Sequence, residues 1–197
     1  MRKLVYYVAS TLDGFIAAPD GSYDFLPLEP DVAAHLSATY PQTFPTFAHA
    51  HYDIDRATGR FDAVVMGRGT YDPALTAGIT SPYAHLQQYV FSRSLPPAAE
   101  PEVEIVSTDP VEFVRGLKRR DGGDIWLAGG GQLAGQLLPE VDELIIKLNP
   151  IVVGSGIPLA TRSFDPRCFT LVETRPFDSG LVILRYARSG GGPTSDG

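Results

Sequence analysis

Three consecutive glycines, Gly129, Gly130 and Gly131, form the segment of this sequence that most directly predicts ligand binding. They follow the apolar run 125–128 and precede a segment, 132–138, that is predicted to be helical. Glycine lets a backbone approach a ligand closely, and the start of a helix offers unpaired N–H groups and a positive dipole end to a phosphate. The segment therefore predicts a phosphate cradle, with a turn needed only for tight packing as the alternative.

The same glycines fit part of a dinucleotide-binding pattern. Gly129, Gly131 and Ala134 satisfy the spacing G-x-G-x-x-G/A. In the Rossmann fold an acidic residue about twenty positions further along binds the ribose. The corresponding stretch, 148–156, contains no carboxylate. The pattern thus favours a phosphate site without supporting a standard Rossmann domain.

Two further apolar runs, 62–66 and 88–92, also end in residues that suit a phosphate or a ribose. The residues at these two ends are Gly67, Arg68, Gly69 and Thr70 in one case and Ser92, Arg93 and Ser94 in the other. A guanidinium can hold a phosphate through two parallel hydrogen bonds, although a lone arginine in a loop is more often simply solvated. Because the carboxyl ends of parallel strands lie on one edge of a sheet, the recurrence predicts a cofactor groove at that edge.

The first loop of the chain offers a different kind of surface. Asp13 and Gly14 follow the first apolar run, and the small or apolar residues Ile16, Ala17 and Ala18 come next. Small side chains here would let a flat ring lie against the backbone. The alternative is a plain turn between the first strand and the next element.

The arrangement of elements around these motifs predicts an α/β domain. The apolar runs lack alternation, which is typical of strands buried on both faces of a mostly parallel sheet; they lie at 4–9, 62–66, 88–92, 125–128 and 144–148. Helices are predicted between strands, at 31–39 with Asp31 as cap, 70–76, 110–120 and 132–138. Segments 169–175 and 181–187 predict an antiparallel hairpin at a sheet edge. Segment 40–60 shows no clear period, and 189–197 is predicted to be a disordered tail after a single domain, 1–188.

Composition excludes several classes of function. The 197 residues carry a net charge of −7, which argues against nucleic acid or an anionic membrane as the main partner. No apolar run is long enough to span a bilayer. The single cysteine, Cys168, excludes an intrachain disulfide and is predicted to be a buried structural residue. We expect a cytoplasmic protein with a small-molecule substrate.

A metal site is one competing interpretation. His49, His51 and Asp53 nearly form the H-x-H-x-D-H run of a binuclear zinc hydrolase, but Ile54 stands in place of the last histidine. Too few imidazoles remain elsewhere to complete such a site. We therefore expect no metal. Trp126 and Tyr71 are expected to pack in the core.

Taken in order, the motifs resemble the dihydrofolate reductase superfamily. The segments are VASTLDGFIA, VVMGRGTY, YVFSRSL, IWLAGGGQLAGQLLP and VDELIIKLNPIVVGSGIPL, followed by the final hairpin. They are most similar to the C-terminal reductase domain of the bifunctional riboflavin-biosynthesis deaminase–reductase and to its stand-alone bacterial relatives. The resemblance spans 1–188. It implies a three-layer αβα fold with a mostly parallel central sheet and an antiparallel C-terminal strand or hairpin, NADPH as hydride donor, and a homodimer.

The resemblance also assigns roles to residues of this chain. The adenosine-side phosphates would be held by Gly67, Arg68, Gly69 and Thr70. The 2′-phosphate and adenine end would lie at Ser92, Arg93 and Ser94. The pyrophosphate would be cradled by Gly129, Gly130, Gly131, Gln132 and Leu133. The nicotinamide would be lined by Ala9, Ile16 and Ala17. An arginine-rich pocket without an acid for a ribose hydroxyl agrees with NADP rather than NAD.

The substrate half departs from the family pattern. The riboflavin reductases usually carry a lysine where this chain has Phe15. We expect no deaminase domain ahead of the reductase. The pterin-binding carboxylate of dihydrofolate reductases has only Asp24 and Asp31 as nearby candidates. We expect an NADPH-dependent reductase of a small heterocycle, most like 5-amino-6-(5-phosphoribosylamino)uracil reductase. A dihydrofolate-type pterin reductase and a non-catalytic NADPH-binding protein are the alternatives. Asp13 is the preferred proton donor, ahead of Asp24, Asp31 or solvent.

Overall fold

The computed structural model describes residues 1–55 and 58–190. The strands are β1 (Leu4–Ser10), β2 (Phe15–Ala17), β3 (Phe61–Gly67), β4 (Gln87–Phe91), β5 (Val103–Val106), β6 (Asp124–Gly129), β7 (Glu143–Leu148), β8 (Ile157–Pro158), β9 (Phe169–Pro176) and β10 (Val182–Arg188). The α-helices are α1 (Pro30–Thr39), α2 (Arg68–Thr76), α3 (Pro110–Lys118) and α4 (Gly131–Leu137). Short 3-10 helices are η1 (Pro41–Thr43), η2 (Thr46–Tyr52) and η3 (Leu138–Glu140).

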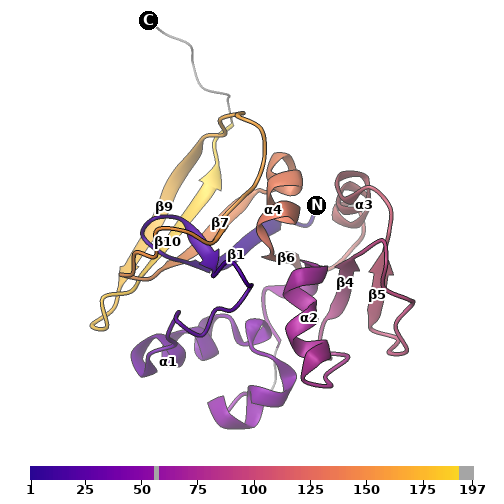
Figure 1. Ribbon diagram of the computed structural model, residues 1–197, viewed down its shortest axis with the longest axis horizontal. Coiled ribbons are helices and arrows are strands. Elements are labelled where there is room, and N and C mark those ends of the chain that lie inside the picture. The colour runs from indigo at the N-terminus through magenta and orange to yellow at the C-terminus, as the bar shows by residue number, and fades with distance from the viewer. Residues whose placement is uncertain (56–57, 191–197) are drawn as a thin grey trace, which may run out of the picture.

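An eight-stranded sheet in the order β5-β4-β3-β6-β1-β7-β10-β9 forms the centre of the molecule (Figure 1). The first six strands of this order run parallel, and β10 pairs antiparallel with both β7 and β9. The predicted mostly parallel sheet with an antiparallel C-terminal hairpin at its edge is therefore confirmed.

Helices cover both faces of this sheet, which gives three layers. Alternate side chains of β1 divide between the two faces: Val5 and Tyr7 pack in the cluster that includes α1 and α2, and Leu4 and Tyr6 pack in the cluster that includes α3 and α4. Figure 1 shows the two helix pairs on opposite sides of the sheet. Both faces of β1 are apolar because both are covered, and this explains the unbroken apolar run in the sequence.

The four α-helices differ in whether a side chain caps their amino-terminal end. At α3 the carboxylate of Asp109 accepts a hydrogen bond from the Glu112 N–H at 2.9 Å, as an N-cap aspartate should. At α1 the predicted cap was wrong: Glu29 is the N-cap residue, and Asp31 lies inside the first turn. Neither α2 nor α4 has a side-chain cap, because the N-cap residue of each is a glycine, Gly67 and Gly130. The N–H groups at these two starts are left for another partner.

The sequence analysis did not predict three short strands, and it wrongly predicted that one exposed side chain would be buried. Strands β2, β5 and β8 have only two to four residues, too few to show a period. The segment after α1 forms 3-10 turns. The expectation of a buried Cys168 was wrong: its side chain is exposed, just ahead of β9, on an edge whose residues face solvent. The predicted tail lies almost entirely outside the described residues.

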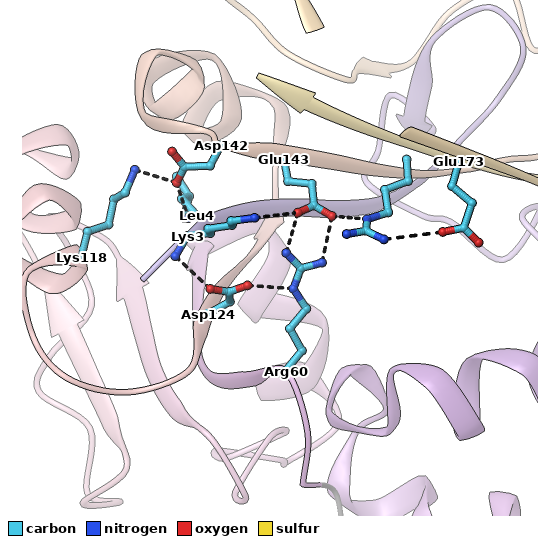
Figure 2. Close-up of polar contacts among 9 residues, drawn as sticks. Lys3, Leu4, Arg60, Lys118, Asp124, Asp142, Glu143 and Glu173 are labelled. Carbon is cyan, nitrogen blue, oxygen red and sulfur yellow. Dashed lines mark hydrogen bonds and ion pairs between the residues drawn. The ribbon is translucent and has the colours of Figure 1, made fainter. Parts of the chain in front are cut away.

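A charged cluster closes the amino-terminal edge of the parallel strands (Figure 2). Glu143, whose side chain is 2% exposed, accepts hydrogen bonds from Arg60 Nη1 at 2.9 Å and Nη2 at 2.6 Å. Arg185 Nε donates to the same carboxylate, and Lys3 Nζ lies 3.8 Å from it. On its other edge, Arg60 Nε donates a hydrogen bond to the Asp124 carboxylate at 2.8 Å. The cluster joins the amino-terminal ends of β1, β3, β6 and β7 to the middle of β10.

Neither a membrane span nor a metal cluster is found in the part of the chain that the structure describes. Within residues 1–55 and 58–190, every helix is too short or too polar to cross a membrane. The same residues contain no group of three or more His, Cys, Asp or Glu side chains placed to hold a metal ion.

Candidate active site

A cleft of about 1650 Å³ opens at the carboxyl edge of the parallel strands, opposite the charged cluster. Residues at or just beyond the ends of β1, β3, β4, β5, β6 and β7 line it. This is the edge at which open α/β sheets bind ligands. Pockets for a single drug-sized ligand measure about 300–1000 Å³, so this cleft has room for a larger ligand or for two.

The cleft places the start of α2 against the glycine turn. A Cβ atom built on Gly67 would lie 3.6 Å from the Gly130 backbone nitrogen, so the two backbones almost touch. The hydroxyl of Thr70 lies above the same turn, 3.7 Å from the position of a Gly130 Cβ. An uncapped helix start, a hydroxyl and a bare backbone thus converge, which suits a phosphate.

The three glycines of the turn differ in why a side chain is absent there. A Cβ on Gly131 would lie 2.3 Å from the Pro158 carbonyl oxygen, so this glycine is required for packing against β8. Gly129 has a φ of +120°, a conformation that side chains disfavour. Gly130 has a φ of −80°, and its Cβ would make only ordinary contacts. The phosphate and packing interpretations of this segment therefore apply to different residues.

Two arginines at the outer part of the cleft differ in their partners. Arg68 donates to the Asp72 carboxylate at 3.2 Å and to the Ser94 hydroxyl at 2.6 Å. Arg93 makes no ion pair or side-chain hydrogen bond with any described residue, and it lines the cleft. Three cations and two carboxylates line the cleft of a chain whose net charge is −7, so the cleft favours an anion locally.

The inner part of the cleft is aromatic and contains one charge. Tyr7, Tyr83 and Trp126 line it, and the Trp126 indole N–H donates to the Tyr7 carbonyl oxygen at 3.0 Å. The ammonium of Lys147 lies 4.4 Å from the centre of the Tyr7 ring. Lys147 is partly exposed and lines this cleft, and burial lowers its pKa to about 8.

The sequence analysis missed Lys147. The one feature of the sequence that could have indicated it is that Lys147 is the only charged residue in the apolar run 144–148. Lys147 pairs with Ala9 across β1 and β7, which places it beside the predicted nicotinamide contact.

Asp13 lies outside the residues that line the cleft. Its carboxylate accepts hydrogen bonds from the Thr11 hydroxyl at 2.7 Å and from the N–H groups of Val153 and Gly154 at 3.1 and 2.7 Å. These bonds, with that from Thr11 foremost, hold the pKa of Asp13 below its usual range. An ionised carboxylate that braces a loop is a poor proton donor, so the geometry does not favour the predicted role.

Most of the residues predicted to bind a cofactor line this one cleft. Those that do are Ala9, Ile16, Ala17, Gly67, Arg68, Gly69, Thr70, Ser92, Arg93, Gly130, Gly131, Gln132 and Leu133. Gly129 and Ser94 do not, although Ser94 reaches the cleft indirectly through Arg68. The candidates for a pterin-binding carboxylate, Asp24 and Asp31, are also absent from the lining.

Comparison with known proteins finds matches that span almost the whole chain. The sequence model of the RibD C-terminal domain matches residues 2–183. The uncharacterized protein YwjB of Bacillus subtilis (strain 168) is 32% identical over 190 residues, covering 95% of this chain and 99% of YwjB.

Two solved structures share the fold. One is a protein of Shewanella sp. PV-4 named for riboflavin biosynthesis, with a TM-score of 0.69 and 25% identity over 96% of this chain and 99% of that one. The other is dihydrofolate reductase from Enterococcus faecalis complexed with NADP(H), with a TM-score of 0.64 and 18% identity over 94% of this chain and 96% of that one.

Proposed function

The chain belongs to the RibD C-terminal domain family, and from that membership we propose that it is an NADPH-dependent reductase of a small heterocyclic substrate. The substrate we propose is most like 5-amino-6-(5-phosphoribosylamino)uracil, and residues 1–188 form the reductase domain. The observation that carries the proposal is the cleft at the carboxyl edge of the sheet, where Gly130, Thr70 and Arg93 are open to a ligand. Cytoplasmic location and a homodimer stay predictions from the sequence.

The phosphate-binding part of the cleft fits a dinucleotide. Gly67, Gly69 and Thr70 would bind phosphate oxygens through the uncapped start of α2. Gly130 would let the pyrophosphate approach the backbone, with Gln132 and Leu133 beside it. Ser92 and Arg93 would bind the 2′-phosphate and ribose. Support comes from the excess of cations lining this cleft in an acidic chain.

The remaining residues would position the two reactants. Bound NADPH supplies a hydride from its nicotinamide ring. Ala9, Ile16 and Ala17 would hold that ring with small apolar contacts, and the aromatic side chains of the inner cleft would exclude water from the reacting atoms. Because Asp13 is bound to the loop at 153–154, we favour solvent over Asp13 as the source of the proton.

The proposal is tested by titrating the purified protein with NADPH and with NADH in a calorimeter. We expect clear binding of NADPH and a much weaker response to NADH. Loss of nicotinamide absorbance is then followed with the pyrimidine intermediate and with dihydrofolate. Failure to bind either cofactor would contradict the proposal. Binding of NADPH without turnover of any heterocycle would favour the non-catalytic alternative.

Replacing Arg93 with alanine should weaken NADPH binding on the order of tenfold to a hundredfold and leave NADH binding nearly unchanged, because a charged hydrogen bond to the 2′-phosphate is lost. Arg68→Ala should have a smaller effect in the same direction, since Asp72 already neutralises part of that guanidinium. Calorimetric dissociation constants for both cofactors measure this. If both variants lose NADPH and NADH equally, these arginines do not bind the 2′-phosphate.

A dihydrofolate-type pterin reductase is the second candidate for this fold. It would need a carboxylate facing the pterin. Of the two carboxylates that line the cleft, Asp72 is bound to Arg68, and Asp20 accepts hydrogen bonds from Ser22 at 2.7 and 2.9 Å. The geometry therefore favours the pyrimidine substrate over the pterin.

A further inference from the structure

One wall of the cleft is apolar and lies apart from the residues proposed to bind the cofactor. The segment that connects β2 to α1 (Figure 1) contributes Tyr23, Leu26, Pro27 and Leu28 to the lining, and Pro45 also lines the cleft. We call these five residues the apolar wall. Tyr23 is 59% exposed and Leu28 is 44% exposed, which are high values for large apolar side chains. Apolar side chains exposed together along a cleft mark a place where a ligand binds.

The segment that carries the apolar wall is shaped by its own backbone. The Ala18 N–H donates to the Ser22 carbonyl oxygen at 2.8 Å, and the Leu26 N–H donates to the Tyr23 carbonyl oxygen at 3.0 Å. The ring of Pro27 fixes the backbone directly after Leu26. A surface that is already held in shape loses little conformational freedom when a ligand binds to it.

The charges around the apolar wall disfavour a phosphate. The stretch 4–55, which contains the whole wall, has seven carboxylates and no lysine or arginine. Among these carboxylates, Asp20 lines the cleft, and hydrogen bonds from Ser22 hold the pKa of Asp20 below its usual range. Asp20 is therefore negatively charged at neutral pH. A phosphate at the wall would lose hydration and meet a like charge without gaining a cation.

The cations of the cleft lie away from the apolar wall. Among the described lining residues they are Arg68, Arg93 and Lys147. Arg93 follows β4, which is separated from β1 by three strand spacings, roughly 14 Å, and the segment of the wall begins beside β1. Arg68 is already bound to Asp72. Lys147 is the register partner of Ala9, where we propose that the nicotinamide ring lies, so none of the three is placed for a phosphate at the wall.

We infer that the apolar wall binds an uncharged apolar group of the substrate, such as a phenyl or alkyl substituent, in place of the phosphate that 5-amino-6-(5-phosphoribosylamino)uracil carries. The inference rests on the proposed reductase function and narrows its substrate class, because it keeps the heterocycle and changes the group attached to it. The wall then discriminates between substrates, whereas the arginines discriminate between cofactors.

The test uses three probes that share a 6-aminouracil ring and differ only in the group on the amino nitrogen. These groups are benzyl, which is apolar, 2-hydroxyethyl, which is polar and neutral, and the phosphate ester of 2-hydroxyethyl. Each probe is titrated in a calorimeter into the full-length protein with saturating NADP⁺, which occupies the cations of the cofactor side. We expect the benzyl probe to bind at least about tenfold more tightly than the phosphate ester, with the hydroxyethyl probe between them.

Two variants with the same substitution locate the effect. Leu28→Lys places a cation in the apolar wall, so it should lower the affinity for the benzyl probe severalfold and raise that for the phosphate ester by at least about tenfold. Leu171→Lys is the matched control, because Leu171 is 51% exposed on β9 and is absent from the cleft lining. It should change the affinity for neither probe.

Several results would overturn the inference. These are a wild-type protein that binds none of the three probes or binds the phosphate ester as tightly as the benzyl probe, a Leu28→Lys protein that keeps the wild-type ranking, and a Leu171→Lys protein that changes it. Circular dichroism confirms that each variant is folded. If Leu28→Lys does not fold, Leu26→Ala decides, because it should lower the affinity for the benzyl probe severalfold.

Failure of the reductase proposal is recognised separately, because it appears as absence of cofactor binding in the titrations with NADPH and NADH. In that case the three probes are ranked on Arg93→Met, which removes the cation that has no partner among the described residues on the cofactor side. The same ranking is expected there, and a preference for the phosphate ester would overturn the inference.

Discussion

Replacing Glu143 with glutamine should lower the free energy of unfolding by about 3 kcal/mol, because it leaves two arginines facing a neutral amide. Arg60 and Arg185 both donate to this carboxylate, whose side chain is only 2% exposed. For a domain of this size that loss corresponds to a melting temperature lower by about 6–12 °C. Urea unfolding followed by circular dichroism measures the free energy directly.

Glu173→Gln is the matched control for this prediction. Glu173 also faces Arg185, at 3.5 Å, but its side chain is 57% exposed. Exposed ion pairs contribute about 0–1 kcal/mol, so this variant should be nearly as stable as the wild type. Equal destabilisation by Glu143→Gln and Glu173→Gln would contradict the claim that burial makes the Glu143 cluster important.

Lowering the pH should remove the stability that the ionised Glu143 carboxylate contributes. Burial alone would raise the pKa of Glu143, but hydrogen bonds and charge from Arg60 and Arg185 outweigh burial and lower it to about 2. A carboxyl whose pKa is lower in the folded state stabilises the fold above its unfolded pKa, and that stability is lost as the pH falls. The difference in unfolding free energy between wild type and Glu143→Gln should therefore be full above pH 4.5 and shrink as the pH falls toward 2. A constant difference across this range would show that the glutamine acts through packing instead.

The residues at the ends of the parallel strands were predictable because the topology follows from the sequence. Unbroken apolar runs indicate parallel strands, and parallel strands bring their carboxyl ends to one edge. Gly67, Thr70, Arg93 and Gly130 could therefore be placed in one groove without any contact being known. The same reasoning placed β9 and β10 as an edge hairpin, since their alternation differs from that of the central strands.

The pairings that span long stretches of chain were not predictable. Lys147 and Tyr7 are separated by most of the protein, and only the register of β1 against β7 brings them together. A lone lysine in an apolar run gives no indication of which ring it will meet. The hydrogen bonds that disfavour Asp13 as a proton donor were unpredictable for a related reason: the groups that bind it, Val153 and Gly154, lie in a distant loop whose approach the sequence does not reveal.

Within the glycine turn, only one of the three positions offers a clean test of cofactor binding. At Gly131 a side chain would strike the Pro158 carbonyl oxygen, and at Gly129 it would meet an unfavourable φ. Either substitution would damage the fold and make lost binding uninformative. At Gly130 the φ of −80° is one that any residue adopts, and the nearest atom to a new Cβ is the Thr70 hydroxyl at 3.7 Å.

Gly130→Val should therefore leave the fold intact and abolish NADPH binding, with an affinity lower by at least about a hundredfold, because a branched side chain fills the space next to Thr70 where the backbone would approach the pyrophosphate. Calorimetry measures binding, and circular dichroism with a melting curve measures the fold. Gly116→Ala in α3 is the matched control: its Cβ would meet nothing within 4 Å, and Gly116 lies outside the cleft lining. It should raise the free energy of unfolding by up to about 1 kcal/mol without changing NADPH affinity. A folded Gly130→Val protein that still binds NADPH tightly would mean that the glycine turn serves packing alone, and the cofactor would then have to bind elsewhere in the cleft.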